Sequence, residues 1–560
     1  MRPGRTAARS FIYALLGCAF ALAAAHAQGI KRERAQTTER VVHVAPFGAG
    51  GGRYVYVPCD VPRGAARVTV SYDYAREGGA NTLDLGVFDA RSGGPGVSER
   101  GFRGWSGGRR SEFFISREEA TPGYLAGGLP AGRWRVVLGL YKVAPAGVDV
   151  KVKIVVETEG RSVVGRAATR RRTAERSATW DTEGMLPREG TPSHQPAGRN
   201  LRWYAGDLHM HTVHSDGDWT ILELAKAAYY NYLDFIIVTD HNTSSHHAEV
   251  GRASNLSRDL LVMRGEEVTT YGGHANAWGL PAGAFVDFRV RPGDARGMSA
   301  AAARAHRLGA LVSANHPFAL CGGCDWSYRD AVKGFDAVEV WNGEWDGTDE
   351  SALKMWDGLL RRGLRPTAVA SSDSHRAENP IGRPATHVAA EELSQAALLN
   401  SIRRGRVYLT REPQGLSVDF EAAAGALGSR SAVGARSGAG AEIRLRAPGP
   451  VVFYVKVRGE HGGTVSLVSD GRVIRTLTGW PYGLTEVFEV ECERDGYYRL
   501  EVRDRAGAML ALTNPVYVKV GGRRSLKGRA ARGGRVSSRP RRAKIRAASQ
   551  AGAPAARSWT

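Results

Sequence analysis

The chain has 560 residues, of which 42% are hydrophobic and 24% are charged. This composition excludes a collagen-like, coiled-coil or wholly disordered protein, and the length corresponds to about three or four folding units. The 77 Lys and Arg residues against 56 Asp and Glu residues give a net charge of +21. A surplus of this size suggests a nucleic-acid or membrane-surface partner, unless the charge lies outside the folded regions.

The positive charge is concentrated at the ends of the chain and in one internal segment. Residues 521–560 contain 12 basic side chains and no acidic one. Residues 201–412 instead contain 22 basic and 26 acidic side chains, which gives this region a net charge of −4. We therefore expect no basic catalytic groove. Nucleic acid is an allowed but not a favoured partner, and the basic tail is suited to an anionic surface or polymer.

The first 27 residues have the pattern of a secretion signal. Three arginines in the first nine positions precede an apolar run over residues 11–25, and Ala25-His26-Ala27 forms a small-x-small cleavage site. We expect a secreted or periplasmic protein whose mature chain begins near Gln28. A less favoured alternative makes Cys18 a lipoprotein cysteine. No later apolar stretch reaches the length of a membrane span, so we expect no transmembrane segment.

Changes in sequence pattern divide the rest of the chain into regions. Short alternating runs broken by Gly and Pro predict a β-sandwich over residues 41–158, followed by an Arg-rich linker over residues 159–200. Strands alternating with amphipathic helices over residues 201–412 predict an α/β domain whose parallel sheet is open or closed into a barrel. Alternating strands over residues 413–520 predict a second β-sandwich, and residues 521–560 are expected to be a disordered tail.

Four cysteines follow the signal, which is too few for a disulfide scaffold in a chain of this length. The pair in Cys321-Gly-Gly-Cys324 could be a redox pair or half of a zinc site, but no second C-x-x-C accompanies it. We favour a small loop disulfide formed after export. Cys59 and Cys492 are left unassigned.

Eleven of the 15 histidines lie within residues 201–412, and many of them follow apolar strands. Five predicted strands end at residues that could bind a metal: His209 with His211, His241, Glu266 with Glu267, His316, and Asp373 with His375. The carboxyl ends of the strands form the active-site face of a β/α barrel, so we expect these side chains to converge. His209 and His211 are two residues apart on a strand and point the same way, so both imidazoles can bind one ion.

These residues carry a family resemblance. The string Asp207-Leu-His-Met-His-Thr-Val-His-Ser-Asp-Gly217, followed by Thr239-Asp-His241, Gly265-Glu-Glu267, His274, His316-Pro317 and Ser372-Asp-Ser-His375, resembles the PHP (polymerase and histidinol phosphatase) family. The flanking β domains, Trp341-Asn342 and the segment from Arg404 to Thr410 are similar to the secreted carbaryl-hydrolase-like (CehA/McbA) metallohydrolases. The resemblance covers residues 201–412 and is only architectural elsewhere.

The resemblance implies a distorted seven-stranded β/α barrel, PHP or TIM-like, that holds two or three divalent metal ions (Zn, Mn or Fe). It implies three ligand groups: His209, His211, Glu267 and Asp373 around one ion, Glu267 bridging to a second ion held by His274 and His316, and Asp216, His241 and His375 around a third. The implied catalytic residues are Glu267, Asp373 and His375. A histidine is common at the position of Asp216, so its carboxylate either weakens the third site or shifts it toward a harder cation such as Mn, Mg or Fe.

Five histidines of the region are given no role in the site: His214, His246, His247, His306 and His387. We expect His246 and His247 to be solvated loop residues, with contacts at the edge of the substrate as the alternative, and His306 to lie on the exposed face of a helix. Asn342 and Arg376 follow ligand-bearing strand ends, and each could either contact an anionic substrate or form a hydrogen bond at the barrel rim.

Hydrolysis is the reaction that this donor set favours. Two cations bridged by Glu267 would lower the pKa of a bound water toward about 7 and give hydroxide at neutral pH. The sequence has no G-x-S-x-G elbow and no P-loop. We therefore expect a secreted phosphoesterase that acts on small phosphate esters through a metal-bound hydroxide. The alternatives are a carboxyl or carbamate ester hydrolase, a 5′-to-3′ exonuclease or nucleotidase, and a non-enzymatic protein that binds the envelope or an acidic polymer, with the barrel as a metal-loaded scaffold.

Overall fold

The computed structural model describes residues 34–46, 53–94, 97–158, 201–254, 257–320, 325–434, 436–459, 463–478 and 483–521, which belong to one compact unit ending at Gly521. The predicted signal, the linker over 159–200, the Cys321 and Cys324 pair and the tail beyond Gly521 lie outside these residues. Cys59 and Cys492 are buried free thiols. Within the described part of the chain, no helix has the length and apolar character needed to span a bilayer.

The N-terminal strands form two four-stranded antiparallel sheets, β1-β8-β3-β6 and β2-β7-β4-β5. Their bounds are β1 Arg34–Val44, β2 Tyr54–Val61, β3 Ala65–Tyr74, β4 Thr82–Phe88, β5 Phe102–Trp105, β6 Glu112–Ser116, β7 Gly132–Lys142 and β8 Val148–Thr158. Side chains alternate between buried and exposed along β8, as expected for strands with one face on a core. Val68 and Val150 from one sheet pack in the same core as Leu83 and Val136 from the other. The two sheets therefore form a β-sandwich.

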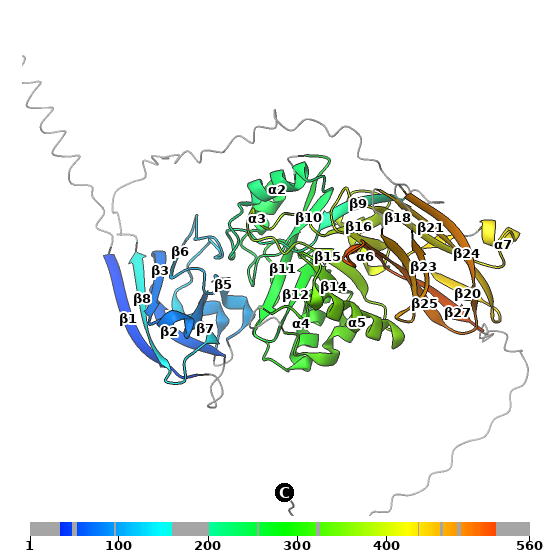
Figure 1. Cartoon of the computed structure of the whole chain (residues 1–560). Helices are drawn as coiled ribbons and strands as arrows, with labels where there is room; N and C mark the ends of the chain where they lie inside the picture. Colours follow the sequence, from blue (N-terminus) through cyan, green and yellow to red (C-terminus); the bar gives the residue numbers. More distant parts are fainter. Residues whose placement is uncertain are drawn as a thin grey trace, which may run out of the picture. The chain divides into compact units, whose positions relative to one another are not determined.

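Strands and helices alternate between residues 202 and 410, as shown in green in Figure 1. The strands are β9 Arg202–Asp207, β10 Phe235–Val238, β11 Leu261–Thr270, β12 Gly273–Trp278, β13 Leu311–Ala314, β14 Ala337–Asn342, β15 Thr367–Ser371, β16 Ala385–Ala390 and β17 Val407–Thr410. The helices are α2 Ile221–Tyr230, α3 His247–Ala253, α4 Ala295–Arg307, α5 Gly347–Arg361 and α6 Gln395–Arg403. Helix α2 begins with a capping box between Thr220 and Glu223, which satisfies backbone N–H groups at its first turn.

The strands of this region form a mixed sheet rather than the parallel one that repeated β-then-α units predict. The order is β15-β14-β13-β12-β11-β10-β9-β16-β17. The pairs β9–β10, β10–β11, β13–β14 and β14–β15 are parallel, whereas β12 and β16 run antiparallel to both of their neighbours. Strand β12 is antiparallel because it returns from β11 through the tight turn at Tyr271 and Gly272, with no helix between the two strands.

A closed barrel is not found in the described residues, because the ladder ends at β15. Beyond the ends of β9 and β15, a single isolated bridge joins Met210 and Ser374. Between β15 and β16, the hydroxyl of Thr386 accepts from the Ala370 N–H at 2.8 Å and donates to the Ala370 carbonyl at 2.6 Å. This side chain takes the hydrogen bonds that a neighbouring backbone would make. The fold is therefore a sheet-rich, mixed α/β structure, and the seven-stranded barrel is not reproduced in closed form.

The C-terminal strands form a second pair of sheets, coloured yellow to red in Figure 1. Their bounds are β18 Ser417–Ala424, β19 Ser437–Gly438, β20 Glu442–Leu445, β21 Gly449–Arg458, β22 Thr464–Ser469, β23 Arg472–Thr478, β24 Gly483–Cys492, β25 Gly496–Arg503, β26 Met509–Thr513 and β27 Val516–Val520, with the short helix α7 Arg430–Gly434 after β18. One sheet has the order β19-β18-β21-β24. The other continues the α/β sheet, because β26 pairs with β17. The two regions thus share a sheet, which the change in sequence pattern near residue 412 did not indicate.

Buried polar contacts also join the C-terminal strands to the α/β region. Arg499 of β25 is 1% exposed and pairs with Asp357 of α5 at 2.7 Å and with Glu501 at 2.7 Å. Asn514 accepts from the Ala368 N–H and donates to the Ala368 carbonyl at the start of β15. Because buried charges and amides tolerate little displacement, these contacts hold the C-terminal strands against the sheet that carries the histidines.

Candidate metal centre

The residues predicted from strand ends lie at one edge of the α/β sheet. His209 and His211 follow β9, His241 follows β10, Glu267 lies in β11, His274 in β12, His316 follows β13, and Asp373 and His375 follow β15, while Asp216 lies in the loop after His211. Parallel strands place their carboxyl ends together. His274 reaches the same edge from near the start of β12, because this antiparallel strand begins where β11 ends.

Glu267 is the centre of this cluster. Its buried carboxylate lies within 3.6 Å of five imidazoles: His209 at 3.2 Å, His211 at 3.6 Å, His241 at 2.6 Å, His274 at 3.2 Å and His316 at 3.3 Å. Asp373 approaches the same cluster from β15, at 3.3 Å from His209 and 3.0 Å from His211. A carboxylate surrounded by imidazoles in this way can bridge two cations, because each of its oxygens faces a different set of nitrogens.

The donor atoms fall into overlapping groups in which all atoms lie within 4.8 Å of one another. The groups are His211, Asp216, His241 and His375; His209, His211 and Asp373; His209, His316 and Glu339; and Glu267, His274 and His316. All nine residues predicted as ligands are therefore brought together. The structure adds His211 to the group predicted for a third ion, and it adds Glu339, which was not predicted.

Glu339 lies in β14 and holds two of the histidines in place. Its carboxylate lies 3.1 Å from Nδ1 of His209 and accepts the backbone N–H of His316 at 2.9 Å. It also accepts from the Asn342 side chain at 3.0 Å, so Asn342 forms a hydrogen bond at the rim of the sheet. The bond to Nδ1 leaves Nε2 of His209 turned toward Glu267 and Asp373. An acid within the apolar run of β14 was the sequence signal for this residue.

Asp207 and Asp240 fix the loops that carry the ligands. The carboxylate of Asp207 accepts the backbone N–H groups of His209, Ser372 and Gly382, and so joins the ends of β9 and β15. Burial raises the pKa of Asp207 to about 6. Asp240 accepts from the backbone and hydroxyl of Thr212. Neither residue was assigned this role from sequence, although both belong to the motifs quoted above.

Several donor atoms in the cluster are buried without a hydrogen bond among the described residues. They are Nε2 of His209, Nε2 of His211, Nδ1 of His316, Oδ1 of Asp216 and Oδ1 of Asp373. Buried polar atoms nearly always have a hydrogen-bond partner. Several such atoms without a partner in one place therefore indicate that a bound group completes the site. Imidazole nitrogens and carboxylate oxygens together are the donors of Zn, Mn and Fe sites. The cluster therefore fits a metal site.

The charges in the cluster favour cations. Burial opposes ionisation of Glu267 and Asp373, but the surrounding imidazoles outweigh it and hold the pKa of both carboxyls well below its usual value. Burial, together with the neighbouring His241 and His375, lowers the pKa of His211 to about 4. At His241 the nearby Asp216 and Glu267 outweigh burial and raise the imidazole pKa to about 9. Protons and metal ions therefore compete for the same donors.

The cluster has a buried side and an open side. The side chains of His209, His211 and Glu267 are 0% exposed, whereas those of Asp216, His241 and His375 are 43%, 18% and 24% exposed. Two residues hold backbone conformations that L-amino acids rarely adopt, because φ is 25° at His316 and 52° at Asp373. Such strain is found at functional sites, where surrounding structure enforces it. The side at Asp216 is therefore the one that solvent reaches.

The histidines that were given no role have different environments. His246 and His247 were predicted to be solvated, and this prediction is wrong, because both are buried and both lie within hydrogen-bond distance of the Gly265 carbonyl, at 3.0 and 3.2 Å. They support β11 next to Glu267. His306 is exposed on α4, as predicted, and lies 2.7 Å from Asp336. The other two are buried: His214 beside Ser245, and His387 stacked on Tyr408. The Arg376 side chain is exposed.

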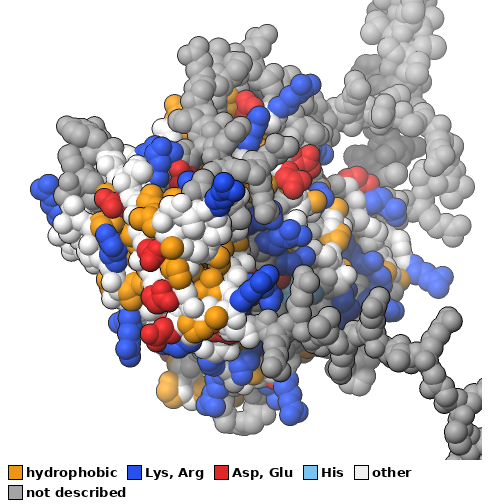
Figure 2. Space-filling model, turned by 90° about the vertical axis from the view of Figure 1, so that its right-hand side faces the viewer, with side chains coloured by type: hydrophobic (Ala, Val, Ile, Leu, Met, Phe, Trp, Pro, Cys, Tyr) orange, Lys and Arg blue, Asp and Glu red, His pale blue; other side chains and the backbone are white. Residues whose placement is uncertain are grey.

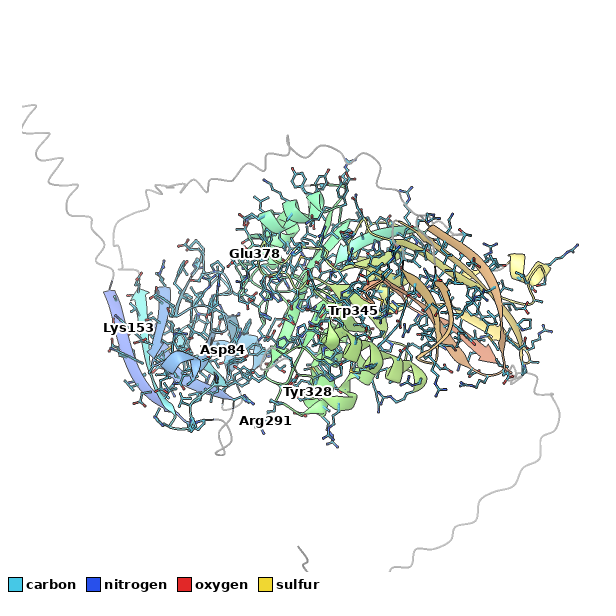
Figure 3. The ribbon with its side chains drawn as sticks, in the orientation of Figure 1. Asp84, Lys153, Arg291, Tyr328, Trp345 and Glu378 are labelled. Carbon is cyan, nitrogen blue, oxygen red and sulfur yellow. The ribbon has the colours of Figure 1, made fainter. Side chains whose placement is uncertain are left out.

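The N-terminal sandwich contacts the loops at the open side of the cluster. Arg109 pairs with Asp218, and Arg110 donates to the Val213 carbonyl at 2.7 Å, on either side of Asp216. Asp84 of β4, labelled in Figure 3, accepts from the Tyr271 hydroxyl at the turn between β11 and β12. The sequence did not predict that the N-terminal β-sandwich contacts these loops. Contacts between residues that are distant in the chain produce no local pattern in the sequence.

Comparison with known proteins finds one family-model match, described as PHP-associated, over residues 361–407, which include Asp373 and His375. A comparison with curated proteins finds no match. The chain is similar to a two-domain protein containing a predicted PHP-like metal-dependent phosphoesterase from Bacteroides vulgatus, with 19% identity over 59% of this chain and 100% of the other and a TM-score of 0.35. It is also similar to a candidate metal-dependent phosphoesterase from Bifidobacterium adolescentis, with 19% identity over 32% and 90% and a TM-score of 0.24. An amidohydrolase from Chromobacterium violaceum has 17% identity over 32% and 89% and a TM-score of 0.24.

Proposed function

We propose that this protein is a metal-dependent hydrolase of the PHP type. The observation that carries the proposal is the buried Glu267 carboxylate, which lies within 3.6 Å of five imidazoles. Divalent cations bound to these donors would lower the pKa of water and offset the negative charge that develops during hydrolysis. The match to a PHP-associated family model over residues 361–407 supports the same assignment.

The protein's own residues orient the donors for this chemistry. Glu339 holds His209 through Nδ1 and the backbone of His316, so the donor atoms of both residues keep their direction without a rearrangement. Asp207 ties the two strand ends that carry His209 and Asp373. Asp216, His241 and His375 line the side that is open to solvent, where a substrate would contact them.

We propose small phosphate esters as the substrates. The donor groups that would hold the cations lie side by side from the buried Glu267 to the open Asp216, and cations bound there would offset the negative charge of a phosphate group. The α/β region carries a net charge of −4, which argues against a polyanionic substrate drawn in by a basic groove. Carboxyl or carbamate esters and nucleic-acid ends are the other outcomes of the test below.

The test is a substrate panel on protein loaded separately with Zn, Mn and Fe. It would include 4-nitrophenyl phosphate, bis(4-nitrophenyl) phosphate, a naphthyl acetate, a naphthyl carbamate and a 5′-phosphorylated oligonucleotide. We expect turnover of the monoester above that of the others, its loss on chelation and its return on adding metal. Turnover of the naphthyl acetate or carbamate without turnover of the phosphate esters would assign a carboxyl or carbamate ester hydrolase. Metal content below about one ion per chain after loading would contradict the metal centre itself.

We also propose that the protein is exported, on the basis of the basic and apolar pattern of residues 1–27. N-terminal sequencing of protein recovered from the periplasm or medium should find a first residue near Gln28. A chain retained in the cytoplasm with Met1 intact would contradict this. Attachment by a lipid at Cys18 would appear as protein in the membrane fraction with that cysteine as its first residue.

A further inference from the structure

The donor group on the open side of the cluster lies in loops and not in strands. Its members are His211, Asp216, His241 and His375. The first two lie in the loop after β9, the third in the loop after β10 and the fourth in the loop after β15. Glu267 instead lies within β11 and is held by the pairing of this strand with β12. The positions of the open-side donors therefore depend on what holds these three loops.

A tight turn of the N-terminal β-sandwich lies against two of the loops. It runs from Thr121 to Tyr124 and is closed by a bond from the Tyr124 N–H to the Thr121 carbonyl at 2.9 Å. Its central residues are Pro122 and Gly123, and φ is 96° at Gly123. This sequence and this φ are those of a type II turn. The shape of the turn is therefore favoured by its own residues.

Both backbone polar groups of Gly123 bond to the loop after β10. The N–H donates to the Ser245 hydroxyl at 3.0 Å, and the carbonyl accepts from the Thr243 hydroxyl at 2.9 Å. The same carbonyl accepts from the Trp105 N–H at 3.1 Å within the sandwich. Thr243 is buried and lies two residues after His241. The turn thus fixes the loop that carries this donor.

The loop after β9 also packs against the turn. A Cβ atom at Gly123 would lie 2.8 Å from the Trp105 carbonyl oxygen and 2.9 Å from the His214 carbonyl oxygen, which is closer than Cβ contacts in proteins. Nδ1 of His214 lies 2.8 Å from the Ser245 hydroxyl that Gly123 also contacts. Glycine is therefore required here, both by the lack of space and by the positive φ.

Two arginines just before β6 hold the loop after β9 at further points. Arg110 donates to the Val213 carbonyl at 2.7 Å, and Arg109 pairs with Asp218. The backbone N–H of Asp218 donates in turn to the His375 carbonyl at 2.7 Å. All three loops of the open-side donor group are thus bonded to the N-terminal sandwich, directly or through Asp218.

The C-terminal strands are attached to the α/β sheet in a different way. Strand β26 pairs with β17, and Asn514 bonds to Ala368 near the start of β15. Where they meet the starts of β9 and β15, they enclose a cavity of about 380 Å³. Figure 2 shows the C-terminal side from outside, with charged and hydrophobic side chains mixed over its surface. The contacts with β15 lie at its amino end, away from the ligands that follow this strand.

We propose that the N-terminal β-sandwich positions the open-side donor group of the metal centre through Gly123 and Arg110. This inference rests on the proposed metal-dependent hydrolase. Metal donors must be held within about 0.5 Å of their productive geometry. Without the turn, the loops after β9 and β10 lose contacts that set their separation, and with it the 3.4 Å distance between Asp216 and His241. Gly123 and Arg110 are positioning residues, because they act through these loops.

The test is a titration of the full chain with cobalt, whose visible absorption reports its coordination, together with metal analysis of the same samples. In Gly123→Ala we expect the most weakly bound cobalt to bind about tenfold more weakly and the remaining cobalt to bind as in the parent. Turnover of 4-nitrophenyl phosphate should fall by about tenfold. Gly128→Ala, in the same loop, is the matched control, since a Cβ there has nothing within 4 Å, and it should behave like the parent.

A double-mutant cycle separates positioning from a general loss of stability. Asp216→Ala removes a donor of the group itself, so adding Gly123→Ala to it should cause little further loss of cobalt or turnover. Thermal unfolding of the metal-free variants would be measured alongside. If Gly123→Ala does not fold, Thr243→Val and Arg110→Met take its place in the cycle. Each removes one side-chain bond between the sandwich and the loops and should weaken the same cobalt severalfold.

Three results overturn the inference. The variants could bind cobalt as the parent does, Gly128→Ala could cause the same loss, or the effects of Gly123→Ala and Asp216→Ala could multiply in the double variant. A parent chain that binds no cobalt overturns the metal centre and this inference together. A parent that binds cobalt without hydrolysing any ester contradicts the hydrolase alone, because the titration still compares the variants.

Discussion

The two ends of the α/β sheet have opposite chemistry, although the same strands form both. At the carboxyl ends, imidazoles and carboxylates surround Glu267, and donor atoms are left without partners. At the other end, arginines and aromatic rings line a cavity against the C-terminal strands. Strands β9 and β15 reach from one end to the other. The middle of β15 is apolar and buried, so its polar contacts lie near its two ends, whereas β11 and β14 carry Glu267 and Glu339 within the strand.

The comparison shows how the sheet separates two electrostatic environments. The cluster lowers the pKa of its carboxyls through nearby imidazoles, and this arrangement attracts cations. The lining of the cavity contains five arginines, and three of them are paired with acids: Arg365 with Glu442, Arg403 with Asp336 and Arg436 with Glu421. Hydrophobic residues such as Val369 and Ala370 of β15 fill the space between them. The following predictions test the metal cluster, the packing beside it and its junction with the C-terminal strands.

The largest effect is expected for Glu267→Gln. Loss of the central charge should remove bound metal and reduce turnover by about 1,000-fold, because the positions of several donors depend on one carboxylate. Glu266→Gln is the matched control on the same strand. Burial raises the pKa of Glu266 well above its usual value, which favours the neutral carboxylic acid that glutamine resembles. Equal losses of metal in both variants would contradict the central role of Glu267.

A large loss of stability is expected for Arg499→Met at the junction with the C-terminal strands. The substitution leaves the buried Asp357 without its cation, whereas Glu501 keeps its pair with Arg503 at 3.0 Å. The unpaired Asp357 should lower the free energy of unfolding by about 3 kcal/mol or more. Urea denaturation would measure it. Arg494→Met is the control, since the Arg494 side chain is 79% exposed and its pair with Asp470 should contribute less than about 1 kcal/mol. Comparable losses for both variants would show that burial does not decide how much an ion pair contributes to the free energy of unfolding.

The next prediction concerns acid and the buried His246. Burial lowers the pKa of His246 to about 4, so the folded protein keeps this imidazole neutral while the unfolded chain takes up a proton below about pH 6.5. Stability should therefore be complete above pH 6.5 and should fall by about 3 kcal/mol as the pH drops to 4. His246→Gln should lose less stability than the parent over this range. The exposed His306→Gln should behave like the parent, and a parent curve parallel to that of His246→Gln would be evidence against a buried neutral imidazole.

The smallest effect is expected for Asp216→Ala on the open side of the cluster. This side chain is 43% exposed and contacts only His241 and His375 among the ligands, each at 3.4 Å. Its loss should reduce turnover by about tenfold and leave most of the bound metal in place. Metal analysis and steady-state kinetics on the same sample would measure both quantities. A loss of turnover and metal as large as that of Glu267→Gln would mean that the donor group at Asp216 and the buried donor groups bind metal as a single unit.

Part of the candidate site was predictable because it lies in short local patterns. Apolar strands that end at His209, His241, His316 and Asp373 identify donors without any knowledge of the fold. The structure places donor atoms of all nine predicted residues in one network, and their binding of metal stays a prediction. Glu339 was missed because it lies within a strand and not at its end, although a charged residue among Val338, Val340 and Trp341 was a signal.

Other features could not be predicted from a single sequence. His246 and His247 lie in a polar segment, and only the packing of α3 against β11 buries them. Strands β15 and β16 do not pair through their backbones, and the Thr386 hydroxyl bonds to the backbone of Ala370 instead. The contacts of Arg109 and Asp84 with the open side of the cluster join residues more than 100 positions apart. None of these contacts produces a periodic pattern in the chain.

By itself, the sequence determined the types of donor and the strand ends that carry them, because a strand with two buried faces must be apolar and any polar residue at its end stands out. It also determined which segments alternate as β-sandwich strands. Only the tertiary structure decided that Glu267 meets five imidazoles, that Glu339 orients His209, and that arginines from the α6–β17 turn close a cavity with Trp203. These are contacts between elements, and their energies depend on distances that the order of residues along one strand does not contain.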